Sequence, residues 1–335
     1  MSQTAWSPQP IPQQPPTTPP AGMMQQPPTQ RGQHSANVWQ LMRNELFKMW
    51  KRPLIWGLLG LDLFFVLAAW AVLVYYATKT PDGFNPGHLL GGPDALSHAI
   101  GQPMTLGRRG GEFIAAALGG LAFGGEFSTG AIRLVLSRGV NRTAYLIAKY
   151  LALAIACLAL VLAGFLMSSL LCNFLLIIHR PAPTLLNMDG RTFGILVGMC
   201  LGTFENFLFC LLLGSALSII TRSAAFGIAA GFGYLIGEDI AAQIVPVVGK
   251  SIHTLLGNQI VNLLFTPNLN AFYAGSLPSF LAKTLDQLDG VIACNPVSKG
   301  CVPVGMGQSF LIALLWAVIL GGVSTYLFIK RDVLQ

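Results

Sequence analysis

The sequence predicts an all-α, polytopic membrane protein with six transmembrane helices. Of its 335 residues, 53% are hydrophobic and only 10% are charged, and the mean hydropathy is +0.61. Ordinary soluble domains do not reach this balance. Apolar runs of about 20 residues, the length that a helix needs to cross a bilayer, recur along the chain. They lie near 54–78, 107–127, 146–178, 192–220, 224–245 and 308–329.

Residues 1–36 precede the membrane domain, which we expect to cover 37–335. This segment is rich in Pro, Gln and Thr, so it cannot bury enough apolar area to offset the entropy that it would lose on ordering. We predict a disordered cytoplasmic tail. A polyproline ligand for a partner module is the alternative interpretation.

Residues 37–52 are predicted to form an amphipathic helix that ends at Pro53. The apolar side chains that fall mainly on one side are Val38, Leu41, Met42, Met49 and Trp50, and the basic ones are Arg43, Lys48, Lys51 and Arg52. Because an apolar run follows directly, we expect an elbow helix that lies on the inner leaflet. A simple stop-transfer flank is the other interpretation, and the two are compatible.

The second and third apolar runs depart from a plain crossing. The clean apolar core of the second, 113–124, is short, and Arg108, Arg109 and Glu112 crowd its predicted outer end. The third run is longer than one crossing needs, which predicts a tilted helix or one that extends beyond the bilayer.

The distribution of Lys and Arg predicts the orientation, because cytoplasmic flanks are enriched in them. One side collects Arg43, Lys48, Lys51, Arg52, Arg133, Arg138, Arg142, Lys149, Arg222, Lys330 and Arg331. The other collects Lys79, Arg108, Arg109, Arg180, Arg191, Lys250, Lys283 and Lys299, diluted by Asp82, Asp94, Asp189, Asp286 and Asp289. We therefore expect the first side, with both termini, to be cytoplasmic. An even number of spans agrees with this.

The segment between the second and third spans, 126–142, combines basic and apolar residues at helical spacing. Leu134, Val135 and Leu136 can lie against a bilayer surface while Arg133 and its basic neighbours stay in the headgroup layer. This favours a short cytoplasmic helix that passes force from a partner to the spans. The alternative is a basic loop that only orients the protein.

Four acidic residues lie within or at the edge of apolar segments. They are Asp62, Glu205, Glu238 and Asp239. An ionisable group inside a membrane is costly, so it is by default a candidate for function. Glu205, Glu238 and Asp239 are candidates for a substrate path, and a hydrogen-bonded contact between helices is the alternative for each.

Glycines recur at intervals of four in the fourth and fifth spans. The sets are Gly194, Gly198 and Gly202 in the fourth, and Gly227 and Gly231 in the fifth. This spacing places each set on one helix face and allows helix backbones to approach closely. We expect tight packing there, within one subunit or across a dimer.

The outer segment 246–307 contains two stretches of helical spacing and is predicted to form an extracellular helical insert. It is either a lid over a translocation path or a packed cap. Cys294 and Cys301 lie in a turn-rich part of it, and an oxidising exterior favours a disulfide between them. A metal site is the alternative, but no further Cys or His lies near at ligand spacing.

Several catalytic motifs are missing from the sequence. It contains no Gly-Xaa4-Gly-Lys-Ser/Thr phosphate loop, no Gly-Xaa-Ser-Xaa-Gly elbow and no His-Glu-Xaa2-His pair. We therefore expect neither ATP hydrolysis nor another enzymatic activity on this chain, and no bound metal or cofactor. The basic residues are spread over loops, which argues against nucleic-acid binding.

The order Glu126, Gly130, Arg133, Leu136, Arg142 and Lys149, followed at once by a long apolar helix, resembles the membrane subunits of type-2 ABC transporters. In that family the segment after the second span typically reads Glu, Gly-Thr, Arg, a Leu-rich turn, a second Arg and a Lys. Here Ala131 replaces the usual Thr, and Gly139 stands where Pro is common. The resemblance covers roughly residues 37–335 and includes the elbow helix.

The resemblance implies a permease subunit in the plasma membrane that pairs with a second permease and with separate cytoplasmic ATPases, which would carry the ATP and magnesium. Glu126, Gly130, Arg133 and Arg142 would then carry the coupling to the ATPase. Export of a substrate is the expected direction, and the substrate class stays open. The alternatives are a secondary transporter or channel that uses Glu205 and Glu238 as ion sites, and a membrane scaffold without transport.

Overall fold

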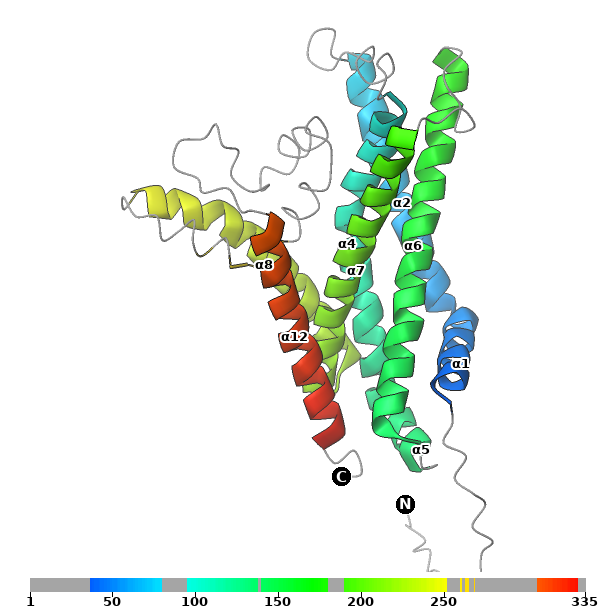
Figure 1. The fold of residues 1–335 in the computed structure, drawn as a ribbon, viewed down its shortest axis with the longest axis vertical. Coiled ribbons are helices and arrows are strands. Elements are labelled where there is room, and N and C mark those ends of the chain that lie inside the picture. The colour runs from blue at the N-terminus through cyan, green and yellow to red at the C-terminus, as the bar shows by residue number, and fades with distance from the viewer. Residues whose placement is uncertain are drawn as a thin grey trace, which may run out of the picture. The chain divides into compact units, whose positions relative to one another are not determined.

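The computed structural model describes residues 37–79, 95–137, 140–179, 190–251, 260, 263, 264, 268 and 306–330. Every regular element in this part of the chain is an α-helix (Figure 1). The helices are α1 (Val38–Lys51), α2 (Pro53–Lys79), α4 (Ala95–Ser128), α5 (Ala131–Ser137), α6 (Arg142–His179), α7 (Gly190–Thr221), α8 (Ala224–Ser251) and α12 (Met306–Lys330). The tail 1–36, Cys294, Cys301 and most of the segment 246–307 lie outside the described residues.

Within the described part of the chain, five helices are long and apolar enough to cross a membrane: α2, α6, α7, α8 and α12. This confirms a polytopic all-α membrane protein. The remaining predicted span, the second (107–127), corresponds to α4, which length and composition alone do not identify as a crossing, because Arg108, Arg109 and Glu112 interrupt its apolar run. The helix also begins at Ala95 and not near 107. Arg108 and Arg109 therefore lie about 20 Å along the helix from its start, and the prediction that they flank its outer end is wrong.

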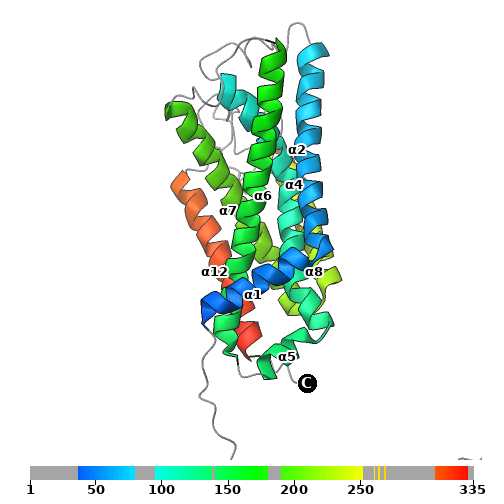
Figure 2. The ribbon, with the colours of Figure 1, turned by 90° about the vertical axis from the view of Figure 1, so that its right-hand side faces the viewer.

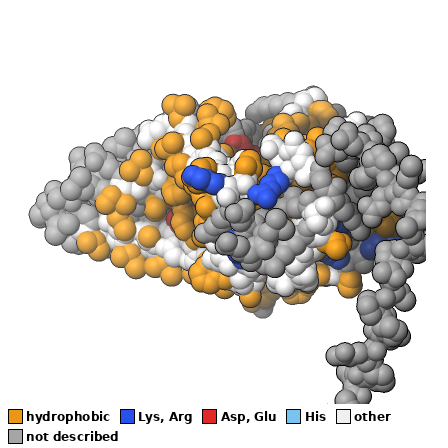
Figure 3. Space-filling model, turned by 90° about the horizontal axis from the view of Figure 1, so that it is seen from below, with side chains coloured by type: hydrophobic (Ala, Val, Ile, Leu, Met, Phe, Trp, Pro, Cys, Tyr) orange, Lys and Arg blue, Asp and Glu red, His pale blue; other side chains and the backbone are white. Residues whose placement is uncertain are grey.

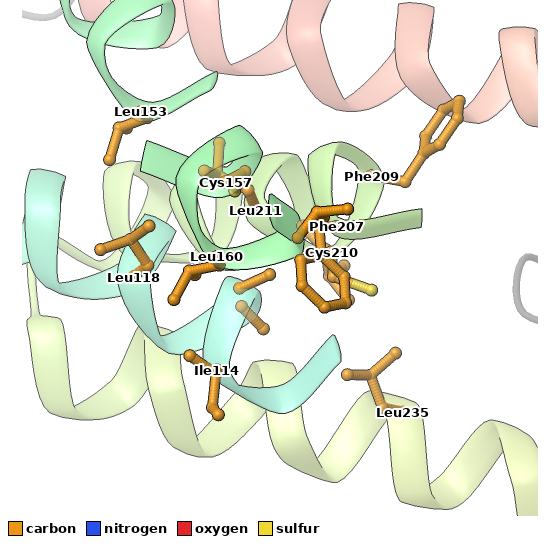
Figure 4. Packing of buried hydrophobic residues seen from close by; sticks show 14 of the residues in the cluster. Ile114, Leu118, Leu153, Cys157, Leu160, Phe207, Phe209, Cys210, Leu211 and Leu235 are labelled. Carbon is orange, nitrogen blue, oxygen red and sulfur yellow. The ribbon is translucent and has the colours of Figure 1, made fainter. Parts of the chain in front are cut away.

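Helix α4 occupies the centre of the helical assembly. It packs against α2, α6, α7 and α8, most extensively against α7, while α12 packs on α7 and α6. Figures 1 and 2 show α2, α4, α6 and α7 running side by side. Figure 4 shows the core between them, where Ile114 and Leu118 of α4 meet Leu160, Phe207 and their neighbours. A central position explains how α4 tolerates charges that lipid would not.

The closest helix contacts are made by glycines. A Cβ at Gly119 of α4 would overlap the carbonyl oxygen of Leu211, and one at Gly214 of α7 would overlap that of Ala116. In α8, a Cβ at Gly227 would overlap the Ser218 hydroxyl, so the packing predicted from this glycine is present. Among the described residues, a Cβ at Gly194 would meet no atom within 4 Å.

Helix α1 is the predicted elbow. It begins after Asn37, whose side chain accepts a hydrogen bond from the Trp39 N–H at 3.5 Å, and Pro53 opens the next helix. It crosses the long helices steeply (Figure 2) and packs Met42 against Ala148 and Ala152 of α6. The face that packs carries Val38, Leu41, Met42 and Met49 of the predicted apolar set, whereas Trp50 is 64% exposed, so its place on that face was predicted wrongly.

Candidate functional site

The segment between α4 and α6 forms a shorter helix than the sequence predicts. Helix α4 runs to Ser128, and Gly130 then adopts a φ of +69°, a left-handed conformation that glycine reaches without steric cost. The short helix α5 covers only Ala131–Ser137. The Asn141 side chain then caps α6 by accepting a hydrogen bond from the Thr143 N–H at 2.9 Å. The prediction of a single helix over 126–142 is therefore wrong, and the short helix in this segment is α5.

Helix α5 lies at one end of the helical assembly, close to the start of α6 (Figures 1 and 2). Its Ile132 is 1% exposed while Leu134 is 60% exposed, so one side is anchored in the protein and the other is open. Arg133 and Leu136 lie on this helix. Seen from this end, Lys and Arg side chains are more prominent than acidic ones (Figure 3). The position and surface suit a docking element.

Glu126 lies on the last turn of α4 and is buried. Its carboxylate forms an ion pair with Lys149 of α6 and accepts a hydrogen bond from the Tyr145 hydroxyl at 2.5 Å. Its other carboxylate oxygen lies 4.0 Å from the Lys48 Nζ. The sequence left open whether Glu126 binds nearby backbone or meets a partner protein. In the structure its charged partners come from α6 and α1.

Glu45 completes this arrangement from α1. It binds the Lys48 Nζ at 2.5 Å and lies 4.0 Å from the Lys149 Nζ. We call Glu45, Lys48, Glu126, Tyr145 and Lys149 the buried charge network, although its Lys48 side chain is 42% exposed and the other four are buried. Two carboxylates face two ammonium groups, so the charges balance, and the Lys149 Nζ also lies 4.9 Å from the centre of the Phe123 ring. The network joins α1 to the adjoining ends of α4 and α6.

Arg142 makes a second connection at the same end. It opens α6, and its guanidinium donates a hydrogen bond to the carbonyl oxygen of Ile329 in the last turn of α12 at 2.9 Å. The carbonyl end of a helix carries partial negative charge, which favours a cation there. Three of the predicted site residues, Glu126, Lys149 and Arg142, thus join α4 and α6, the helices that flank α5, to each other and to α12.

A separate polar cluster lies along α4. The Arg108 guanidinium is bound by Glu112 at 2.8 Å, and both side chains are buried. Arg109 lies 3.2 Å from Glu112 and 3.4 Å from Asp239 of α8. Asp239 therefore makes a contact between α8 and α4, as the alternative interpretation of this residue predicts.

The other acidic candidates are spread over different helices. Glu238 is buried on α8, and Glu205 is half-buried on α7. Within the described residues, Glu205 makes no hydrogen bond with Glu238 or Asp239. Asp62 of α2 is buried and faces Gly111 of α4 and Gly164 of α6. No group of three or more His, Cys, Asp and Glu side chains suited to a metal occurs in this described part.

The sequence reasoning missed Glu45, Lys48 and Tyr145 as members of the site. A signal for Glu45 was present, because it stands between Met42 and Met49 on the apolar face of α1, where a charge needs a buried partner. Tyr145 lies one turn before Lys149 on the same helix face.

A family model described as "ABC-2 family transporter protein" matches residues 39–333. The match begins in α1 and extends past the end of α12, so it includes α5 and the buried charge network. No curated protein matches the chain.

Proposed function

The chain belongs to the ABC-2 transporter family, and from this premise we propose that it is the permease subunit of an exporter driven by a separate cytoplasmic ATPase. The observation that carries the proposal is α5, a short helix with an exposed Leu134 and a buried Ile132, held at one end of a membrane protein. Membrane subunits of this family typically work with such a partner.

The mechanism begins with docking of the ATPase on the exposed side of α5. Closure of two ATPases on ATP would displace α5, and the buried charge network would carry that displacement to α1, α4 and α6 together. Separating a buried ion pair would leave an uncompensated charge in the protein interior, which is costly. The network therefore favours movement of the three helices together. Glu126 and Lys149 are thus positioning residues, whereas Arg133, Leu134 and Leu136 belong to the docking helix.

The remaining parts of the proposal concern assembly and orientation. Two permease subunits would pair, and the ATP and magnesium would be held by the ATPase chains. The end that carries α5 would face the cytoplasm, with both termini, and the membrane would be the plasma membrane. The basic residues at this end support that orientation.

The test is copurification of an ATPase with the full chain from its native host in mild detergent, compared with the Leu134→Ala variant. Leu151→Ala is the matched control, because Leu151 is also exposed but lies on α6. We expect a phosphate-loop protein with wild type and Leu151→Ala, and its loss with Leu134→Ala. Retention by Leu134→Ala would overturn docking on α5, and absence of any ATPase from wild type would overturn the ATP-driven mechanism.

Charge reversal at Glu126 would not be a clean test of docking. This carboxylate is buried against Lys149 and Tyr145, so Glu126→Arg would disturb the permease itself. A variant at Leu134 changes the surface alone.

A second candidate function is proton- or cation-coupled transport. It is favoured by Asp62, a buried carboxylate without an ion-pair partner among the described residues. Reconstituted protein without an ATPase would then move substrate in response to a pH gradient, and Asp62→Asn would abolish that movement. Dependence on ATP alone would exclude it.

A further inference from the structure

A cavity of about 230 Å³ lies between α1, α2, α4 and α6, apart from the coupling segment. All of its lining side chains are hydrophobic, among them Met49 of α1, Leu59 of α2, Leu118 of α4 and Ala156 of α6. Pockets for whole drug-sized molecules usually measure about 300–1,000 Å³. This one suits part of an elongated apolar ligand.

Two exposed tryptophans line one end of the cavity, and we call this end its mouth. Trp50 is 64% exposed and Trp56 is 46% exposed, and both are lining residues. The rings meet edge to face at 4.6 Å, and the Trp56 indole N–H donates to the Trp50 carbonyl oxygen at 3.0 Å. Tryptophan prefers the headgroup level of a bilayer, so the mouth of the cavity faces the boundary between headgroups and acyl chains.

Two basic residues stand between these tryptophans. Lys51 and Arg52 link α1 to α2, and both are exposed. Cations at the headgroup level attract anionic lipids, and guanidinium binds phosphate with two parallel hydrogen bonds. An apolar cavity with a tryptophan mouth and adjacent cations matches the chemistry of one molecule, a lipid with an anionic headgroup.

We propose that this cavity binds one acyl chain of an anionic phospholipid, whose phosphate is held by Lys51 and Arg52. The leaflet is the cytoplasmic one if the orientation proposed above holds, but the binding itself does not depend on an ATPase. Because Met49 and Leu46 of α1 line the cavity close to Glu45 and Lys48, the bound chain supports the elbow against the bundle. The lipid is a resident ligand and not the exported substrate.

The experiment is a titration of delipidated full-length protein with phosphatidylglycerol or phosphatidylcholine, followed by native mass spectrometry. Ala156→Phe places a ring in the cavity, and Ala225→Phe, at an exposed position of α8, is its control. Arg52→Glu removes the phosphate partner, and Arg43→Glu, an exposed basic residue on α1, is its control. We expect Arg52→Glu to weaken binding of phosphatidylglycerol at least about fivefold, as loss of one cation at an anionic surface predicts.

A second measurement does not require Ala156→Phe to fold. Phosphatidylglycerol with brominated chains should quench wild-type fluorescence, and Trp56→Phe should remove part of that quenching. The proposal is supported if Ala156→Phe and Arg52→Glu weaken binding while both controls bind as wild type does. It is overturned if phosphatidylcholine binds equally well, if Trp56→Phe leaves the quenching unchanged, or if a transported substrate or a second copy of the chain occupies the site. Loss of an ATPase in copurification would leave these results intact, so the two proposals fail separately.

Discussion

Lys149 faces two carboxylates from a buried position on α6, and its removal would leave Glu126 without its main compensating charge and Glu45 with Lys48 alone. Breaking a buried ion pair from one side costs about 3–5 kcal/mol, whereas replacing both partners costs far less. We expect Lys149→Met to lower the free energy of unfolding in detergent by about this amount, and Glu126→Gln with Lys149→Met to recover much of it. Denaturant unfolding measures both.

Arg43→Met is the control for this pair, because Arg43 is exposed, and surface changes usually stay within about 0.5 kcal/mol. If the effects of Glu126→Gln and Lys149→Met simply added, the two side chains would not be energetically coupled.

At Gly130 the backbone conformation, and not the space around the residue, limits which side chain the position can accept. Its φ is +69°, and a Cβ there would meet no atom within 4 Å of the described structure. A left-handed conformation costs a non-glycine residue about 1–2 kcal/mol, and Asn tolerates it best. We therefore expect Gly130→Val to impair the turn into α5 and Gly130→Asn to be nearly neutral. Thermal unfolding and ATP hydrolysis by the complex distinguish the two variants. Equal unfolding temperatures and equal hydrolysis rates would contradict the conformational explanation.

At the scale of elements, the contact between α4 and α7 depends on the absence of side chains. A Cβ at Gly119 would overlap a backbone oxygen of α7, so the helices must separate. Overpacking of this kind costs typically about 1–3 kcal/mol. We expect Gly119→Ala to lower the unfolding temperature in detergent and Gly57→Ala, where a Cβ would meet nothing within 4 Å of the described residues, to leave it unchanged. Equal shifts in the unfolding temperature of the two variants would show that helix propensity, and not packing, determines the effect.

The start of α4 shows what sequence reasoning could not reach. Pro103 and Gly107, Gly110 and Gly111 resemble a loop, because both residue types usually break helices. In the structure α2 packs on these glycines: a Cβ at Gly107 would lie 2.9 Å from the Val66 side chain, and one at Gly110 would overlap Phe65. Tertiary packing thus outweighs local propensity, and the helix extends back to Ala95.

Hydropathy predicted the long helices well, but the sequence did not predict which side chains pair between helices. The long apolar helices and the elbow follow from composition and periodicity. The partners of Glu126 come from α1 and α6, and nothing in a single sequence says that these helices meet at that level. The resemblance located the segment around α5 but could not show that Glu126 is buried.

At the scale of the whole molecule, the orientation can be tested by labelling in intact cells. In a background with Cys294→Ser and Cys301→Ser, Thr129→Cys beside α5 and Gly190→Cys at the start of α7 introduce exposed thiols at opposite ends of the helices. We expect a membrane-impermeant maleimide to label Gly190→Cys at once and Thr129→Cys only after lysis. The reverse pattern would place α5 outside and remove the proposed site of ATPase docking.

The burial of Glu126 and Lys149 has a consequence for how the complex responds to ionic strength. At 1 M salt the screening length is about 3 Å in solution, which weakens contacts between exposed charges but hardly reaches a pair whose side chains are 3–4% exposed. A concentrated salt wash should therefore leave α1 seated on α4 and α6, even where it weakens contacts between exposed charges enough to release a partner protein. A preparation that lost its partner in this way would still be a native permease, ready for reassembly when the salt is diluted.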